Sequence, residues 1–376
     1  MNIAICIIAY NRIDSLKRVL KSLEQAYYDE PITLFISVDK SETNSVEMFA
    51  EQYIWKFGTK KVITHSANLG LRKHVLKCGD LLELYDALII LEDDVSVAPS
   101  FYYYAKQCVE KYVDNRNIAG ISLYNFPINY QNLLPFNPLH SDSDIYLMQC
   151  AQSWGQVWMK KQWFKFKEWY ELHSEDFDES LHLPRAISNW PKSSWLKYHI
   201  KYCIENKKYF VYPYISLSTN NADIGTHYTN KTTIFQTPLF YGLKTSFNLE
   251  PEVLYDGFFE NENLCELLGY NIDELCVDFY GEKGNRLKKK YWLTRKILPF
   301  KIIKSYALSF KPYELNVIQN NIGNDLFLYD TSVKEKNGKV RNLERNFYEY
   351  LYYIDFYSFQ QLKKQVKIFV KRFIKC

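Results

Sequence analysis

An apolar run that ends in three consecutive carboxylates constrains this chain more than any other feature. Residues 87–91 are Ala-Leu-Ile-Ile-Leu, and Glu92, Asp93 and Asp94 follow them directly. A continuous apolar run of this length predicts a strand that is buried on both faces, as in a parallel sheet. Open α/β sheets bind their ligands beyond the carboxyl ends of the strands, where the three acids would lie. The run therefore predicts a site at the edge of a parallel sheet.

The three acids also limit what that site would bind. Adjacent carboxylates repel one another, and a hard cation such as Mg²⁺ or Mn²⁺ keeps them ionised most easily. On an extended chain, Glu92 and Asp94 would face one way and Asp93 the other. The alternative is a solvated turn at the end of a strand, because charge runs usually lie on the surface.

Strands and helices alternate around this run. We expect strands over residues 2–9, 32–38, 61–64, 87–91 and 118–123, with helices over 14–23, 71–85 and 100–112. This alternation predicts an α/β fold with a mostly parallel, doubly wound, Rossmann-like sheet. Polar residues follow other strands as well, namely Arg12, Asp39 and Asn68. They would share the carboxyl edge with the acids, which favours a binding site over a solvated turn.

The second half of the chain is marked by tryptophans. Four of them fall between residues 154 and 169, and further strands are expected over 145–150 and 209–214. Core packing is the ordinary role of such large aromatics. Sugar rings also stack on indole faces, so the segment with Trp154, Gly155 and Trp158 is a candidate acceptor-binding loop. We expect the chain up to residue 245 to consist of two halves, residues 1–125 and 126–245.

The C-terminal region is basic, although the net charge of the chain is only +4. Residues 285–312 contain nine Lys or Arg and no acid, and residues 361–376 contain six and no acid. Such a region suggests a polyanionic surface as partner. Residues 361–376 also predict a basic amphipathic helix that lies on an anionic membrane, or alternatively docks on the protein's own core. We expect 246–376 to form a basic, mainly helical extension.

Other features narrow the class of protein. The eight cysteines include no Cys-x-x-Cys pair, which argues against a zinc site or a disulfide framework and fits a reducing compartment. No apolar run approaches the roughly 20 residues of a membrane span. The N-terminus passes straight into a strand, so we expect no signal peptide. These features favour the cytoplasm, with the protein peripheral on the inner face of a bacterial membrane.

Several short motifs resemble those of GT-A fold glycosyltransferases. The resemblance covers about residues 1–230 and extends to N-acetylglucosaminyltransferase I and its bacterial capsule and polysaccharide-synthesis relatives. It implies a nucleotide-sugar half over residues 1–125 and an acceptor half over 126–245. The motifs that carry it are residues 9–12 (AYNR), 37–39 (SVD), 91–95 (LEDDV), 98–101 (APSF), 189–195 (NWPKSSW) and 212–216 (YPYIS).

The resemblance implies roles for the polar residues at the sheet edge. Asp94 would bind Mn²⁺ or Mg²⁺ directly, Asp93 would lie near the ribose, and Glu92 would make a supporting contact. The remaining residues implied to bind the nucleotide-sugar are Arg12 near the diphosphate, Asp39 on the uracil N–H, Asn68 and Arg72. A guanidinium fork suits phosphate oxygens.

The implied activity is metal-dependent, inverting transfer of a sugar from a UDP-sugar to a carbohydrate. The acceptor would be a lipid-linked oligosaccharide in surface polysaccharide synthesis, and the terminal helix would bind membrane rather than nucleic acid. In the family a carboxylate follows the W-P-K-x-x-W segment and serves as general base, but here Leu196 and Lys197 stand there. The base is therefore unassigned.

Three acids and one histidine remain candidates for the missing functions. Asp176, Asp178 and Asp223 are candidate general bases, and each can equally be a solvated loop acid. His227 lies in a loop that resembles the G-T-H loop of bacterial relatives, where it could reach the metal or the diphosphate; the alternative is a structural histidine.

Two other functions stay open at this point. The same layout of sheet and acids serves nucleotidyltransferases of sugar-nucleotide metabolism, although these usually carry a glycine-rich segment after the first strand, and residues 9–12 contain no glycine. The basic segments are also compatible with a non-catalytic protein that binds polyanions or membranes.

Overall fold

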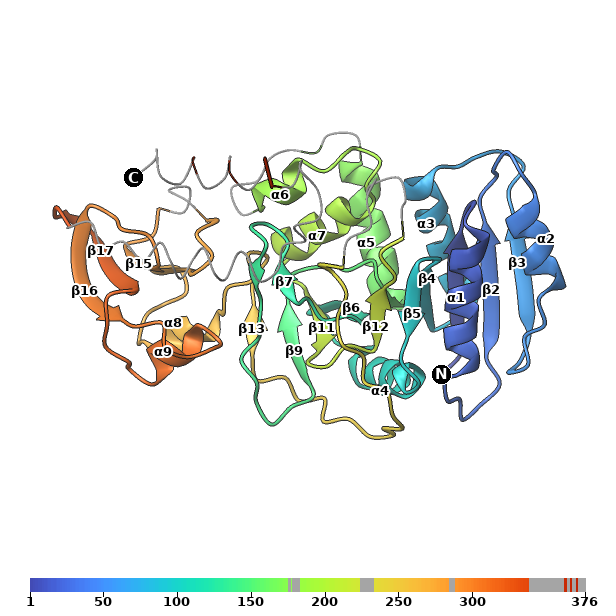
Figure 1. The fold of residues 1–376 in the computed structure, drawn as a ribbon, viewed down its shortest axis with the longest axis horizontal. Coiled ribbons are helices and arrows are strands. Elements are labelled where there is room, and N and C mark those ends of the chain that lie inside the picture. The colour runs from blue at the N-terminus through green and yellow to red at the C-terminus, as the bar shows by residue number, and fades with distance from the viewer. Residues whose placement is uncertain are drawn as a thin grey trace.

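The computed structural model describes residues 1–174, 177, 183–223, 233–283 and 288–337, together with positions 362, 363, 366 and 370. A nine-stranded sheet forms its centre, in the order β13-β9-β11-β6-β10-β4-β1-β2-β3 (Figure 1). Its strands are β1 (Ile3–Ala9), β2 (Thr33–Val38), β3 (Lys60–Thr64), β4 (Ala87–Glu92), β6 (Ile118–Ser122), β9 (Ile145–Met148), β10 (Gln156–Met159), β11 (Tyr209–Pro213) and β13 (Leu254–Tyr255).

The N-terminal half of this sheet is parallel. β1 lies between β2 and β4 and runs parallel to both, and β2 pairs in parallel with β3. Ile8 is opposite Ser37 on one side and Glu92 on the other, so β1, β2 and β4 end at one edge. β10 runs antiparallel between β4 and β6, and β11 is parallel to β6. The predicted α/β class with a mostly parallel sheet is confirmed.

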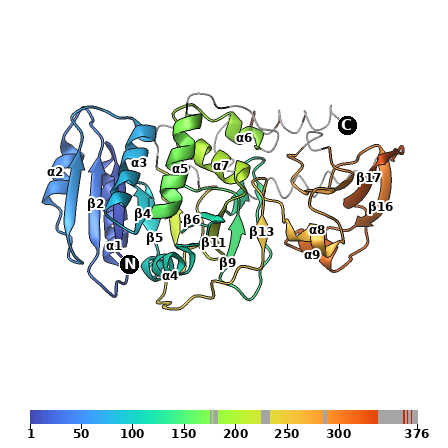
Figure 2. The ribbon, with the colours of Figure 1, turned by 180° about the vertical axis from the view of Figure 1, so that it is seen from behind.

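Helices cover both faces of the sheet (Figure 2). α1 (Ile13–Glu24), α2 (Ser45–Gln52) and α4 (Phe101–Tyr112) contribute buried residues to one core cluster. α3 (Leu71–Gly79), α5 (Lys160–His173) and α7 (Leu196–Glu205) contribute to the cluster on the other face. A short η1 (Asp80–Glu83) follows α3, and α6 (Arg185–Ser188) precedes α7.

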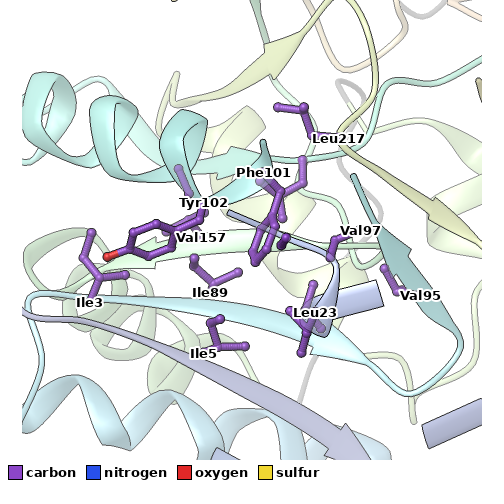
Figure 3. Packing of buried hydrophobic residues seen from close by; sticks show 14 of the residues in the cluster. Ile3, Ile5, Leu23, Ile89, Val95, Val97, Phe101, Tyr102, Val157 and Leu217 are labelled. Carbon is purple, nitrogen blue, oxygen red and sulfur yellow. The ribbon is translucent and has the colours of Figure 1, made fainter. Parts of the chain in front are cut away.

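Successive residues of β1 alternate between the two cores, as the two-residue period of a strand requires. Ile5 belongs to the first cluster and Cys6 to the second. Figure 3 shows Ile5 close to Ile89 of β4 and Leu23 of α1. Because both faces are covered, every residue of β1 is buried, which explains the uninterrupted apolar sequence.

A small ribbon lies beside the carboxyl edge. β5 (Val95–Val97) follows the acidic residues directly and pairs antiparallel with β12 (Ser218–Asn220). In this register Asn220 lies opposite Val95. The chain therefore returns after β11 to lie next to the turn with the acids. A second short pair is formed by β7 (Ile128–Asn129) and β8 (Leu134–Pro135).

The described part of the C-terminal extension is a four-stranded sheet, so the prediction of a mainly helical extension is wrong for these residues. The strand order is β14-β15-β17-β16, with β14 (Leu275–Asp278), β15 (Tyr291–Thr294), β16 (Phe300–Tyr306) and β17 (Leu326–Lys334). Two short helices, α8 (Asn263–Leu267) and α9 (Glu314–Ile318), also occur between residues 246 and 337. Register shifts after Phe300 and Ile302 interrupt the alternation along β16, which hides the strand period in the sequence.

The expected boundary near residue 245 falls before the last strand of the central sheet, because β13 pairs with β9. The terminal amphipathic helix lies largely outside the described residues. Its described positions are helical, and Leu362, Val366 and Val370 are exposed. Among the described helices, none has the length and apolar character needed to cross a membrane.

Candidate active site

One arginine joins the ends of two neighbouring strands. Arg12 follows β1 and is the N-cap residue of α1. Its Nη1 lies 3.1 Å from Oδ2 of Asp94, and its Nη2 forms an ion pair with Oδ1 of Asp93. These residues are 81 and 82 positions apart in the chain. They meet because β1 and β4 are adjacent and parallel, as expected from the sequence.

The two aspartates do not face opposite ways, so that expectation is wrong. Asp93 and Asp94 form a turn between β4 and β5 instead of continuing the extended strand. The two-residue alternation of side chains holds only for extended backbone. The turn lets one guanidinium bond both carboxylates.

Burial makes the three acids harder to ionise than free carboxyl groups, and Arg12 offsets only part of this effect. Burial raises the pKa of Asp93 to about 6, although the charge of Arg12 opposes this rise. Burial raises the pKa of Glu92 to about 8, and the charges of Asp94 and Asp93 add to the effect. The pKa of Asp94 is also raised, mainly by burial. Desolvated carboxylates in this state favour a further cation.

The acidic turn fits a divalent metal ion with one protein ligand. Oδ1 of Asp94 is buried and has no hydrogen-bond partner among the described residues. A carboxylate oxygen is the ligand that Mn²⁺ and Mg²⁺ prefer. No group of three or more His, Cys, Asp or Glu in the described residues could hold a metal by itself. The remaining ligands would have to come from a substrate or from water.

Asp39 lies at the end of β2 and is nearly buried, with 4% of its surface exposed. Its Oδ1 accepts the backbone N–H of Leu69 and its Oδ2 that of Gly70, both at 2.9 Å. These bonds tie β2 to the start of α3. Asn68 is exposed and donates to the carbonyl oxygen of Lys40 at 2.8 Å. Binding of uracil by Asp39 and of the nucleotide by Asn68 stay predictions.

Arg72 faces the second half of the molecule. Its guanidinium donates to the hydroxyl of Tyr170 at 2.5 Å, the carbonyl oxygen of Ser174 at 2.9 Å and that of Lys192 at 3.0 Å. It also lies 4.4 Å from the ring centroid of Tyr198. These contacts join α3 to α5 and to the segment before α7. A contact of Arg72 with the nucleotide-sugar stays a prediction.

Asp223 is close to the acidic turn and is bound to α1. Its Oδ2 accepts a hydrogen bond from Ser15 Oγ at 2.6 Å and forms an ion pair with Arg18. Its negative charge contributes to the raised pKa values of Asp93 and Asp94. Sequence reasoning did not single out Ser15 and Arg18. Their spacing of three residues in the first turns of α1, just after Arg12, places both near the site.

The acceptor-binding prediction for Trp158 is wrong. Its side chain is fully buried and stacks on Trp163, with ring centroids 3.9 Å apart. Core packing against α5 decided its role, because it points from β10 into the sheet's second face. Trp154 is half-buried, and its ring centroid lies 5.0 Å from that of Tyr124. Sugar stacking by Trp154 stays a prediction.

Gly155 allows a close approach between the tryptophan loop and β12. Its φ of +97° is a conformation that other residues rarely adopt. A Cβ at this position would lie 2.8 Å from Ser218 Oγ. This is a structural requirement, and direct contact of Gly155 with an acceptor stays a prediction.

The general base stays unassigned. Asp176, Asp178 and His227 lie outside the described residues. Of the two residues that follow the W-P-K-x-x-W segment, Lys197 is buried and its Nζ donates to the carbonyl oxygen of Trp190 at 2.8 Å. Lys197 therefore has a structural contact where relatives are implied to carry a carboxylate.

Together the fold and this edge define an α/β enzyme site suited to a divalent cation and a diphosphate. Residues 4–135 match the family model of Glycosyl transferase family 2, and this range includes Arg12, Asp39, Asp93 and Asp94. This match supports the class of enzyme, a glycosyltransferase, that the sequence motifs predicted.

Solved glycosyltransferase structures are also similar, at low identity. The mannosyltransferase PcManGT from Pyrobaculum calidifontis, in complex with GDP-Man and Mn²⁺, is 11% identical over 43% of this chain and 45% of its own, with a TM-score of 0.30. S. aureus TarS 1–349, in complex with UDP-GlcNAc, is 12% identical over 56% and 58%, with a TM-score of 0.35. GalNAc-T7 with UDP, GalNAc and Mn²⁺ is 11% identical over 56% and 42%, with a TM-score of 0.35.

The chain thus spans between 42% and 60% of the lengths of these three structures and the other TarS structures. No curated protein sequence matches the chain.

Proposed function

We propose that the protein is a metal-dependent, inverting glycosyltransferase that moves a sugar from a UDP-sugar to a carbohydrate hydroxyl. The observation that carries this proposal is the free, buried Oδ1 of Asp94 beside Arg12, at the edge where β1 and β4 end. The family match of residues 4–135 supports the class of reaction. A single carboxylate ligand suffices when a nucleotide diphosphate supplies most of the others.

The residues at the edge divide the work of binding the donor. Asp94 would hold Mn²⁺ or Mg²⁺, which stabilises the charge that develops on the departing diphosphate. Arg12 would donate to the phosphate oxygens as well as to Asp93 and Asp94. Asp93 would contact the ribose, and Asp39 would accept the uracil N–H and so select uridine.

The proposed acceptor is a lipid-linked oligosaccharide in surface polysaccharide synthesis. Support comes from the basic C-terminal segment, residues 361–376, which contains six Lys or Arg and no acid. Such a surface would hold the enzyme on an anionic membrane, with each nearby lysine contributing roughly 1 kcal/mol. The proposed location is the inner face of a bacterial membrane.

A thermal-shift comparison of nucleotides tests the activity class. UDP with Mn²⁺ should raise the melting temperature more than UDP alone, and more than GDP or CMP with Mn²⁺, because a ligand of the folded state stabilises it. Transfer from UDP-sugars would then be measured directly. A melting temperature that no nucleotide raises in the presence of Mn²⁺ would favour the non-catalytic polyanion-binding protein instead.

Removal of residues 361–376 tests the proposed membrane contact. The shortened protein should no longer sediment with vesicles that contain anionic phospholipid, because six Lys or Arg are lost. Its transfer to a soluble acceptor should stay within about twofold, since the N-terminal site is unchanged. Vesicle binding equal to that of the full chain would favour a terminal helix docked on the protein.

A further inference from the structure

Asp223 follows β12, and the pairing of β12 with β5 holds this part of the chain against the acidic turn. β12 pairs with β5, and the backbone N–H of Asn221 donates to the carbonyl oxygen of Asp94 at 2.8 Å. The hydroxyl of Ser96 also donates to Oδ1 of Asn221 at 3.0 Å. These contacts hold β12 and Asn221 in place next to Asp94, the proposed metal-binding residue.

The side chain of Asp223 is in turn bound to α1. Oδ2 of Asp223 accepts from Ser15 Oγ at 2.6 Å and pairs with the guanidinium of Arg18. Ser15 is 4% exposed, and the side chain of Asp223 is 17% exposed. The side chain of Arg18 is 43% exposed, so the contact of Asp223 with the buried Ser15 is the better fixed of the two.

The contacts form a closed ring around Asp94. Arg12 at the start of α1 bonds its carboxylate, and Asn221 bonds its backbone. Asp223, two residues after Asn221, returns to α1 through Ser15 and Arg18. Three chain segments that are distant in sequence thus determine where the free Oδ1 of Asp94 points.

We propose that Asp223 is a positioning residue for the donor site, acting through Arg18 and Ser15, and not the general base. Both donors bond the same oxygen of Asp223, so the carboxylate is engaged in holding α1. The inference rests on the proposed function, because it concerns how well the site binds a UDP-sugar with its metal. Loss of the contacts of Asp223 with Ser15 and Arg18 would loosen the acidic turn without removing any group that contacts the donor.

The experiment compares Asp223→Ala, Arg18→Ala, the double variant and Asp223→Asn. Each alanine variant should weaken binding of UDP with Mn²⁺ by about tenfold in calorimetry. Asp223→Ala already breaks the contacts with both Ser15 and Arg18, so the double variant should lose no more than Asp223→Ala alone. The kcat should stay within about threefold, with an unchanged pH profile. Asp223→Asn retains an acceptor oxygen and should recover part of the affinity.

A matched control removes an ion pair far from the site. Asp114 pairs with Lys161 on the surface, and both side chains are more than half exposed. Asp114→Asn should therefore leave UDP affinity, kcat and melting temperature unchanged. If Asp223→Ala does not fold, Arg18→Ala tests the same pair from the side of α1.

Other outcomes would overturn the inference. A general base would show kcat reduced by about 10²-fold or more in both Asp223 variants, while Arg18→Ala kept its kcat. Losses that multiply in the double variant would show that the two residues act separately. If the wild-type protein binds UDP and all variants bind it equally well, the inference about Asp223 is overturned but the proposed function is not. Wild-type protein that does not bind UDP with Mn²⁺ would overturn the proposed function and the inference together.

Discussion

Two clusters of three acids lie in different parts of this chain, and only one of them has the properties of a binding site. The site cluster is Glu92, Asp93 and Asp94, and the junction cluster, next to β13 and β14, is Asp256, Glu260 and Asp278. The cation of the site cluster, Arg12, approaches from the edge of the sheet and leaves Oδ1 of Asp94 free. The cation of the junction cluster, Lys283, is buried and pairs with Asp256.

Access distinguishes the clusters more than charge does. Each contains a buried carboxylate oxygen without a hydrogen-bond partner among the described residues, on Asp94 in one and on Glu260 and Asp278 in the other. Glu260 and Asp278 are 1% and 0% exposed, whereas the side chain of Asp94 is 14% exposed. Buried Lys283 pairs with Asp256, and Lys296 lies 3.7 Å from Oδ2 of Asp278, so lysines of the chain itself balance the junction acids. The comparison teaches that an acidic triplet becomes a site when its missing cation has to come from outside.

The largest effect is expected from Asp94→Asn. The amide cannot replace the carboxylate as a metal ligand of full charge, so turnover with Mn²⁺ should fall by about 10³-fold, equivalent to roughly 4 kcal/mol of transition-state stabilisation. The melting temperature without ligand should stay within a few degrees of wild type. Initial rates with a UDP-sugar measure the effect, and near-normal turnover in this variant would remove the site cluster from the mechanism.

Lys283→Met should produce the opposite pattern. Removal of this buried cation leaves Asp256 without its ion-pair partner, although Lys296 still offsets Asp278. Breaking a buried pair of this kind costs about 3–5 kcal/mol of unfolding free energy. Affinity for UDP with Mn²⁺ in the folded fraction should be unchanged, because Arg12 and Asp94 are not touched.

Urea denaturation followed by tryptophan fluorescence measures the change caused by Lys283→Met. Lys161→Met removes a surface lysine paired with Asp114 and should cost less than about 0.5 kcal/mol. Equal stability of the two variants would show that Lys283 does not balance the junction acids.

The smallest effect is expected from Glu260→Gln and depends on pH. Burial raises the pKa of Glu260 well above its ordinary value, and the charges of Asp278 and Asp256 add while that of Lys283 opposes. The folded protein therefore keeps a proton that the unfolded chain loses near pH 4.3. Stability from this proton is fully present below that pH and is lost as pH rises through the folded value.

The amide of Glu260→Gln does not titrate, so the variant lacks the contribution of Glu260 to the pH dependence of stability. The variant should melt about 2–4 °C higher than wild type at pH 9 and show no gain at pH 4. Melting curves between these pH values test the sign. A gain that is largest at low pH would contradict the raised pKa.

Much of the fold and part of the site could be predicted because they depend on local pattern. The apolar run at 87–91 is a strand buried on both faces, and Arg12 meets Asp93 and Asp94 because parallel neighbours end at one edge. Predictions failed where one local sequence pattern is compatible with two different structural roles. Trp158 is buried although indoles also stack on sugars, and the C-terminal strands escaped notice because register shifts interrupt β16.

In the N-terminal half, the sequence by itself determined the strands, the helices and the edge at which the polar residues gather, since these follow from periodicity along the chain. Only the tertiary structure decided which charged residues pair with one another. Asp223 pairs with Arg18 across 205 positions, and Asp94 receives Arg12 across 82. Such partners follow from the order of strands and the return of β12 to β5, which no short stretch of sequence encodes. The acidic turn therefore became a specific arrangement, with one free carboxylate oxygen, only when the whole sheet was assembled.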